Sequence, residues 1–128
     1  LSRASTAVST TLRERSQNGN SSNVIYYSSE FDSIFENHQL QRKFKHSKDF
    51  GVLGNYNPLN GKVFRDKIIE HMRSSQQING TYHGKEVMHY FNEDTGLNVM
   101  INSETKKFIS GWLTSQEQRK YILNEGKL

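Results

Sequence analysis

The spacing of apolar residues changes near Gln77, and this change constrains the fold more than any other feature of the chain. Before Gln77, large apolar residues recur three and four positions apart, as Phe31, Ile34 and Phe35 do, which is the period of an amphipathic helix. After it, short segments rich in β-branched and aromatic residues alternate with turn-forming residues, which is typical of strands. Helices followed by an antiparallel meander predict an α+β domain, with N-terminal helices packed on a small antiparallel sheet and a short C-terminal helix.

The first part of the pattern predicts three helices. Ser29 is a suitable N-cap for the first, in which His38 continues the apolar stripe. The second helix would bury Leu40 and Phe44 on one side. The expected helices cover 29–38, 39–48 and 63–72, and the only proline, Pro58, lies in a turn at 55–61.

The second part predicts four strands and a closing helix. Polar, turn-forming segments at 92–96 and 102–105 mark two hairpin loops. A helix is expected at 115–124, with Gly126 just past its end. The expected strands cover 78–82, 86–91, 97–101 and 107–113.

The N-terminal residues differ in composition from the rest. Residues 1–28 are rich in Ser, Thr, Arg and Asn, and we expect a linker or a tail associated with import into a target cell, although 4–12 has a weak helical pattern. The remaining 29–128 is expected to form one domain. The chain begins with Leu1 rather than Met, which indicates a piece of a longer protein.

Charge and cysteine content narrow the classes of function. The 128 residues carry a formal net charge of +4, which favours a polyanionic partner such as a nucleic acid. Cysteine is absent, which excludes disulfides and zinc sites with Cys ligands. No run is long and apolar enough to span a bilayer and no signal-peptide core is visible, so we expect no membrane anchor.

One basic segment, 42–51, carries groups that could cleave a phosphodiester bond without a metal. It holds four cations, one imidazole and one carboxylate, with two aromatic rings between them. In a helix Lys43 and His46 share a face, and the charges of Lys43 and Lys45 lower the pKa of His46, so that a neutral ring is available as a base. Asp49 is placed to orient that ring, to pair with Lys45 or to cap a helix. The alternative for the whole segment is a solvated basic face.

A second segment, 108–112, contains a hydroxyl and an indole. Alternation along a strand predicts that Phe108, Ser110 and Trp112 share one face. Ser110 is suited to donate a hydrogen bond to a phosphate oxygen. Trp112 is suited to stack on a base, although a lone tryptophan in a small domain is more often part of the core. Gly111 leaves the opposite face open to close approach.

Other polar residues are secondary candidates. Arg42, Lys48 and Lys85 are candidates for contacts with a phosphate backbone, and the alternative for each is a solubilising charge. His89 lies in an expected strand beside two aromatic residues and is a candidate second acid. The histidines and carboxylates show no metal-ligand spacing, so we expect no metal and no cofactor.

Several motifs occur together and in a fixed order. They are KFKHxxDFG at 43–51, GTYxG at 80–84, HYFNxxTGLNV at 89–99 and FxSGW at 108–112. In this order they resemble the colicin-D-like ribonuclease domains, among them the C-terminal toxin domains of contact-dependent growth-inhibition (CDI) proteins. The resemblance extends from about Gln39 to Leu128.

The resemblance implies a metal-independent, tRNA-cleaving endoribonuclease whose sheet belongs to the barnase–EndoU–colicin–RelE group. The essential residues of the family pattern fall on Lys43, Lys45, His46, Ser110 and Trp112. The implied products are a 2′,3′-cyclic phosphate and a 5′-hydroxyl. The implied partners are tRNA and a cognate acidic immunity protein. The domain would be secreted or delivered from the cell surface within a larger effector and act in the target-cell cytoplasm.

Two other readings of the residues stay open. A non-catalytic RNA-binding module would use the same cations and aromatic rings for affinity alone, and a basic adaptor domain would bind an acidic protein. The tRNA isoacceptor, a cut in the anticodon loop or in the acceptor stem, and the participation of a host translation factor are open as well.

Overall fold

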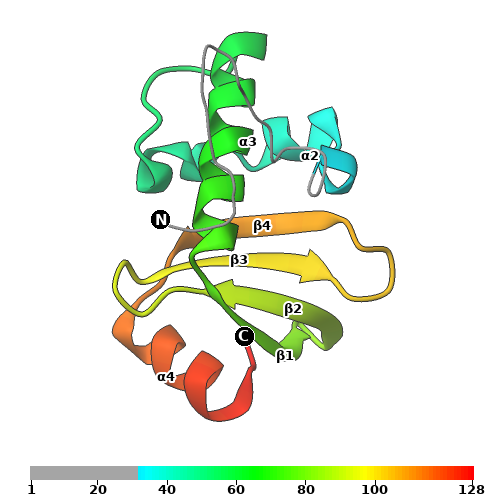
Figure 1. Ribbon diagram of the computed structural model, residues 1–128, viewed down its shortest axis with the longest axis vertical. Coiled ribbons are helices and arrows are strands. Elements are labelled where there is room, and N and C mark those ends of the chain that lie inside the picture. The colour runs from blue at the N-terminus through cyan, green and yellow to red at the C-terminus, as the bar shows by residue number, and fades with distance from the viewer. Residues whose placement is uncertain (1–31) are drawn as a thin grey trace, which may run out of the picture. The chain divides into compact units, whose positions relative to one another are not determined.

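The computed structural model describes residues 32–128, so the expectations for 1–28 and for a helix cap at Ser29 lie outside the described part of the chain. Figure 1 shows the order of the elements along the chain. They are the 3₁₀ turn η1 (Asp32–Ile34), α2 (Asn37–Arg42), the 3₁₀ helix η2 (Phe44–Phe50), α3 (Pro58–Arg73), β1 (Gln76–Tyr82), β2 (Lys85–Phe91), β3 (Leu97–Asn102), β4 (Phe108–Leu113) and α4 (Gln116–Glu125).

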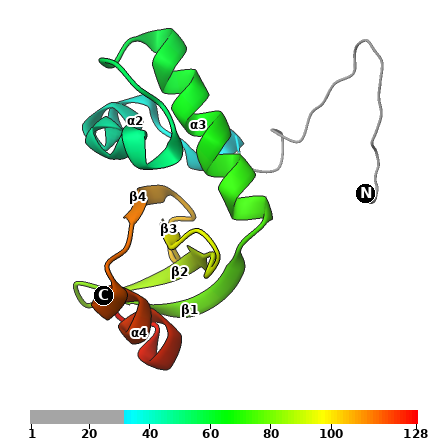
Figure 2. The ribbon, with the colours of Figure 1, turned by 90° about the vertical axis from the view of Figure 1, so that its left-hand side faces the viewer.

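The four strands form one antiparallel sheet in the order β1-β2-β3-β4, which is the order of a simple meander. The segment from α2 to α3 lies on one side of this sheet and α4 lies on the other (Figures 1 and 2). The predicted α+β arrangement, with N-terminal helices on a small antiparallel sheet and a short C-terminal helix, is confirmed.

The main core lies between α3 and the sheet. Phe64, Ile68 and Met72 recur every four residues along α3, and each is at most 3% exposed. They belong to one buried cluster with Val99 of β3 and Phe108 of β4. The apolar stripe of α3 therefore holds the helical layer against the strands, as its period predicts.

The helix predicted at 29–38 is wrong. In the described part of this range the structure shows the short η1 turn and the start of α2 at Asn37, and between them Glu36 is extended (φ −106°, ψ 137°). The apolar residues here pack on the core from irregular backbone. The ring of Phe35, for example, lies 5.3 Å from that of Phe108, so burial rather than helix formation explains the pattern.

The helix predicted at 39–48 is correct only in its first turn. α2 ends at Arg42, and the chain continues as the 3₁₀ helix η2. Phe44, Ser47 and Phe50 are buried along η2, so its inward positions recur every three residues. Three residues per turn is the period of a 3₁₀ helix, which places all three side chains on one side.

The third helix begins earlier than predicted. Pro58 is at the start of α3, and the side chain of Asn57 caps the helix by accepting a hydrogen bond from the backbone N–H of Asn60 at 2.8 Å. Proline suits this position because the first helical N–H has no partner within the helix. The predicted turn at 55–61 therefore ends at Asn57. No helix within 32–128 is long and apolar enough to cross a membrane.

The predicted strands and closing helix are confirmed, with ends that shift by at most two residues. Ser115 caps α4 in a reciprocal pair with Gln118, each side chain accepting a hydrogen bond from the other residue's backbone N–H. Gly126 ends the helix in the left-handed conformation (φ 63°). These short-range signals fix where α4 begins and ends, directly after β4.

Candidate active site

Most of the predicted catalytic residues meet at one hollow of about 450 Å³ on the surface. The hollow lies where η2 meets β4 and the end of β1. It brings together all five residues expected to be essential, although β4 lies some sixty positions after η2 in the chain. Its lining consists of Lys43, Lys45, His46, Asp49, Tyr82, Ser110, Trp112 and Leu113.

The switch from α2 to η2 places the basic residues. Lys43 is both the C-cap of α2 and the N-cap of η2, and its carbonyl accepts the backbone N–H of His46 at 3.0 Å. Residues three apart overlie one another in a 3₁₀ helix, so Lys43 and His46 lie on the same side. Both are half-buried, whereas Lys45 is exposed. The predicted common face of Lys43 and His46 thus comes from 3₁₀ rather than α-helical geometry.

The rings of His46 and Trp112 are in contact. Their centroids are 5.7 Å apart with an interplanar angle of 39°. Trp112 is held from its other end, because its Nε1–H donates to Oε1 of Gln118 at 3.2 Å. The same oxygen caps α4, so the start of that helix fixes the indole. Trp112 is half-buried and is therefore a wall of the hollow rather than a core residue.

A β-bulge decides which side chains of β4 face the hollow. Met100 pairs with Ser110 but its neighbour Ile101 pairs with Phe108, so Ile109 is an extra residue in β4. Paired residues point to the same face, and consecutive residues to opposite faces. The prediction that Phe108 shares a face with Ser110 is therefore wrong, and the bulge sends the phenyl ring into the main core.

The hydroxyl of Ser110 is buried without a hydrogen bond from the described residues. The residue is 0% exposed, and its Oγ has no hydrogen-bond partner among residues 32–128. An unpaired buried hydroxyl costs about 1–3 kcal/mol of folding free energy, and a ligand oxygen that accepts its hydrogen bond recovers part of that cost. The contact of this hydroxyl with a phosphate oxygen stays a prediction, since a hydroxyl of a residue that is 0% exposed meets a ligand only after its surroundings shift.

Gly111 allows η2 to approach β4 closely. A Cβ at this position would lie 2.8 Å from Cγ2 of Val99 and 3.2 Å from Cζ of Phe50. The face of β4 that Gly111 was predicted to leave open is thus occupied by the ring of Phe50. A side chain at Gly111 would therefore force Val99 to shift and the ring of Phe50 to give way slightly.

Asp49 provides a second tie between η2 and β4. Its Oδ2 accepts the backbone N–H of Leu113 at 3.0 Å. Of the roles considered for Asp49, the structure shows neither helix capping nor an ion pair with Lys45, and the carboxylate instead bonds the strand that carries Ser110 and Trp112. It also lines the hollow, where its charge acts on His46.

The surroundings of His46 favour a neutral ring. Burial is the largest cause and lowers the pKa of His46 below its ordinary value of 6.5, and Lys45 lowers it further. The Asp49 carboxylate raises the pKa, and Lys43 contributes a smaller lowering. The predicted direction is confirmed, although burial outweighs either lysine. A neutral imidazole beside two ammonium groups is a base next to positive charge, which is what attack on a phosphodiester requires.

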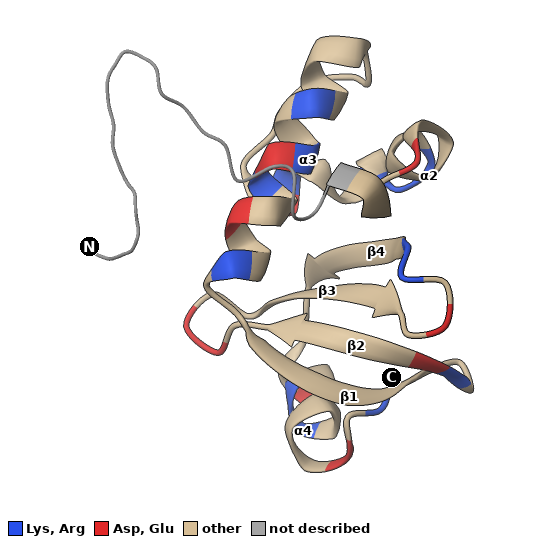
Figure 3. Ribbon diagram, turned by 45° about the vertical axis from the view of Figure 1, so that its right-hand side comes forward, with Lys and Arg blue, Asp and Glu red and all other residues tan. Residues whose placement is uncertain are grey.

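The predicted phosphate-binding cations lie outside this hollow. Arg42 and Lys48 are exposed on the same segment as His46 but do not line it. Lys85 lines a different hollow, of about 620 Å³, together with the carboxylates of Glu86 and Glu104. Figure 3 shows one basic and one acidic residue next to each other at the start of β2, where the sequence has Lys85 and Glu86. In contrast, β3 and β4 carry no charged residue along their lengths. Lys85 is therefore not brought to the other candidates.

His89 is not placed to act as a second acid. Its side chain is 0% exposed, its Nε2–H donates to the carbonyl of Gly126 at 2.8 Å, and its Nδ1 accepts from Nδ2 of Asn98 at 3.0 Å. A buried ring with both nitrogens engaged cannot reach a substrate. The position beside aromatic residues reflects packing between the sheet and the C-terminal segment, and we do not retain the acid role.

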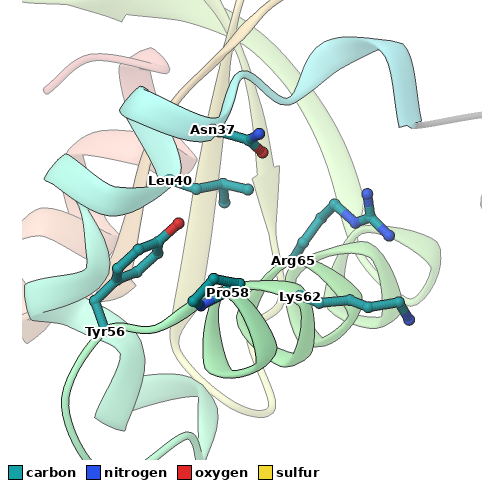
Figure 4. Close-up of a pocket in the computed structure, with 7 residues that line it drawn as sticks. Asn37, Leu40, Tyr56, Pro58, Lys62 and Arg65 are labelled. Atoms are coloured by element: carbon teal, nitrogen blue, oxygen red, sulfur yellow. The ribbon is translucent and has the colours of Figure 1, made fainter.

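A further hollow of about 390 Å³ lies between α2 and the first turns of α3 (Figure 4). Lys62 and Arg65 line it, and both are within ion-pair distance of Asp66, at 3.3 and 3.7 Å. None of the predicted catalytic residues reaches it. Within 32–128, no three His, Asp or Glu side chains are grouped so as to hold a metal ion.

The sequence analysis missed two residues of the site, Tyr82 and Gln118. Tyr82 lines the hollow with its ring centroid 5.9 Å from that of Trp112. The only signal for Tyr82 was its place in the GTYxG motif at 80–84. For Gln118 the signal was the Ser-x-x-Gln spacing of a capping box, which also brings the amide to the indole.

Comparison with known proteins places the chain in a family. The Colicin D family matches residues 39–122, a range that contains every residue lining the hollow. Colicin-D of Escherichia coli is 39% identical over 83 residues, which are 61% of this chain and 12% of that protein. The solved structure of a ribonuclease from Escherichia coli in complex with its inhibitor protein matches with 34% identity and a TM-score of 0.59, over 70% of this chain and 100% of that one.

This chain thus spans only a small part of the curated relative, and the region that matches is the region that builds the site. Since the family match covers well over half of the residues and is supported by the fold, the chain belongs to the colicin D family.

Proposed function

We propose that this chain is the toxic domain of a larger bacterial competition protein and that it cleaves tRNA without a metal. The observation that carries the proposal is the meeting of His46, Lys43, Lys45, Ser110 and Trp112 at one hollow. The structural neighbour is a ribonuclease and the curated relative is a colicin, which agrees with this chemistry.

In the proposed reaction the neutral ring of His46 takes the proton from a ribose 2′-hydroxyl. The 2′-oxygen then attacks the adjacent phosphorus, and the bond to the 5′-oxygen breaks. Lys43 and Lys45 stabilise the negative charge that builds up on the phosphorane oxygens, and Ser110 donates a hydrogen bond to one of them. The products are a 2′,3′-cyclic phosphate and a 5′-hydroxyl, whose oxygen takes its proton from water.

Cleavage is expected to persist in excess EDTA. The base and the cations of the proposed reaction are protein side chains, so removal of divalent ions leaves them in place. The measurement is incubation of the domain with unfractionated bacterial tRNA plus EDTA, followed by mapping of the new ends. Loss of activity in EDTA that Mg²⁺ or Zn²⁺ restores would disprove the lysine-and-histidine mechanism. Binding of tRNA without any new ends would favour an RNA-binding module.

We further propose that the domain is secreted or displayed at the cell surface within its larger protein, as in contact-dependent growth inhibition, and that it acts in the cytoplasm of the target cell. The support is the colicin relative, of which this chain matches 12%. A producing cell then needs an inhibitor, and the structural neighbour was solved with its inhibitor protein.

The inhibitor is expected to be an acidic immunity protein that covers the hollow between η2 and β4. Carboxylates that bury Lys43 and Lys45 would compete directly with tRNA, and complementary charge speeds association at low salt. The association rate should therefore fall as ionic strength rises, and excess tRNA should slow it, both measurable by stopped-flow binding. A complex that leaves Lys43, Lys45 and His46 open to solvent would contradict this mode of inhibition.

A further inference from the structure

The ring of Tyr82 extends the aromatic side of the hollow. From His46 the next ring is Trp112, at 5.7 Å between centroids, and the one after is Tyr82, at 5.9 Å and 56° from the indole. The three rings come from η2, β4 and β1, which meet only in the folded chain. Trp112 thus contacts both the ring of the proposed base and the ring of Tyr82.

The backbone holds Tyr82 in a fixed place. It is the last residue of β1 and pairs with Lys85 across a two-residue turn, in which His83 (φ 50°) and Gly84 (φ 82°) adopt the left-handed conformation. The ring of His83 packs edge-on against Tyr82 at 4.2 Å. A ring with this support loses little conformational entropy when a ligand binds to it.

The C-terminal segment clamps the same strand end. The backbone N–H of Thr81 donates to the carbonyl of Gly126 at 2.7 Å, and the N–H of Leu128 donates back to Thr81 at 2.9 Å. The N–H of His83 donates to the carbonyl of Leu128 at 3.2 Å. These hydrogen bonds hold the outer edge of β1 in place next to the hollow. The position of Tyr82 is therefore not the result of a loose turn.

Core packing does not explain Tyr82 either. It is half-buried and is neither a member of the main apolar cluster nor packed against it. The ring instead faces a hollow lined by two lysines and a serine with an unpaired hydroxyl, which suit a phosphate.

We propose that Tyr82 is a specificity-determining residue that stacks on an unpaired base of the substrate, next to the phosphate that is cleaved. The inference rests on the proposed ribonuclease function. Because the rings of Tyr82 and Trp112 are already in contact, the base lies against their shared surface rather than between them. A base inside a continuous helix cannot offer its face to these rings, so the ligand is a nucleotide that has left the helical stack.

The test compares Tyr82→Leu with Tyr121→Leu, a control in which an exposed tyrosine of α4 is removed outside the hollow. Loss of one base–aromatic stack should raise KM for bacterial tRNA about 5- to 100-fold, with a smaller effect on kcat. Tyr82→Phe should recover most of the loss, because it keeps the ring. Thermal unfolding checks each variant, and Tyr82→Thr replaces Tyr82→Leu if that protein does not fold.

A second readout does not depend on turnover. Trp112 is the only tryptophan, so its fluorescence reports on the hollow, and in the His46→Ala background tRNA should quench it without being cut. Adding Tyr82→Leu should weaken this binding by a factor similar to that in KM. A single-stranded RNA oligonucleotide should bind more tightly than the same strand in a duplex, and only the single strand should respond to Tyr82→Leu.

The outcomes separate the two proposals. If the wild-type domain cleaves tRNA and Tyr82→Leu behaves like Tyr121→Leu, the role of Tyr82 is wrong and the ribonuclease function stands. If the wild-type domain cleaves no RNA but its fluorescence is quenched in a Tyr82-dependent way, the stacking role stands and the catalytic proposal falls. Quenching that is the same with and without the Tyr82 ring overturns the stacking role.

Discussion

Replacement of His46 by alanine is expected to lower the rate of tRNA cleavage by about 10²–10⁴, the usual contribution of a general base. The residue is half-buried, lines the hollow, and has its pKa lowered mainly by burial, so the wild-type ring is neutral and available at pH 7. Alanine removes the base and the ring contact to Trp112 but leaves η2 with its buried residues. The measurement is single-turnover cleavage of bacterial tRNA, with circular dichroism to confirm the fold.

The matched control is His38→Ala, which removes a histidine whose side chain is 69% exposed and lies outside the hollow. It should cleave like the wild type. Affinity of His46→Ala for the inhibitor should stay within about tenfold, since one neutral side chain rarely dominates an interface. A well-folded His46→Ala protein with near-normal turnover would remove this residue from the mechanism.

The pH dependence gives a further check on His46. Its pKa lies below 6.5, so kcat/KM should be level near neutral pH and should fall as pH drops through that lowered value and the ring becomes protonated. Asp49 raises this pKa, and Asp49→Asn keeps an oxygen for the Leu113 N–H while it removes the charge. The fall in rate should therefore move to lower pH in Asp49→Asn. A shift to higher pH would contradict the assigned electrostatics.

Lys43→Ala and Lys45→Ala are expected to reduce kcat by about 10²–10³, as the loss of one preorganised charge-stabilising group does. Their effect on tRNA affinity should be much smaller, because their charge acts on the phosphorane rather than on the bound substrate. Both residues line the hollow with His46. Rapid-quench measurement of the chemical step, together with filter binding of tRNA, separates the two effects.

Arg42→Ala and Lys48→Ala are the matched variants, since they remove cations of the same segment that do not line the hollow. They should weaken tRNA binding and flatten its dependence on salt, with little change in the rate of the bound complex. If all four substitutions change binding alone and to the same extent, the segment serves affinity and the RNA-binding module is the better interpretation.

The sheet and α4 could be predicted from the sequence because their signals are short-range. The loops at 92–96 and 102–105 contain the residues that tight turns require, and Ser115 and Gln118 are spaced as a capping box. Such signals act within a few residues, so they remain valid whatever the rest of the chain does. The basic residues of the site were also found in this way, since their chemistry is visible without a fold.

The helical part was predicted less well because packing decides its form. The apolar spacing near Phe35 and Phe44 is compatible with an α-helix, but the structure uses irregular backbone and a 3₁₀ helix there. Burial of Phe44, Ser47 and Phe50 against α3 and β4 favours three residues per turn over the local preference. No pattern within a single segment carries that information.

The site shows the same division. The residue types at 42–51 and 108–112 already predicted a base, cations, a hydroxyl and an indole for phosphodiester chemistry. Which side chains meet was decided by long-range contacts: the bulge at Ile109 turns Phe108 into the core, and packing buries His89. The turn at the end of β1 adds Tyr82 to the hollow. The sequence shows which chemical groups are present, residue by residue. Their arrangement depends on strand pairing and burial between segments that are far apart in the chain, and both are decided only when the chain folds.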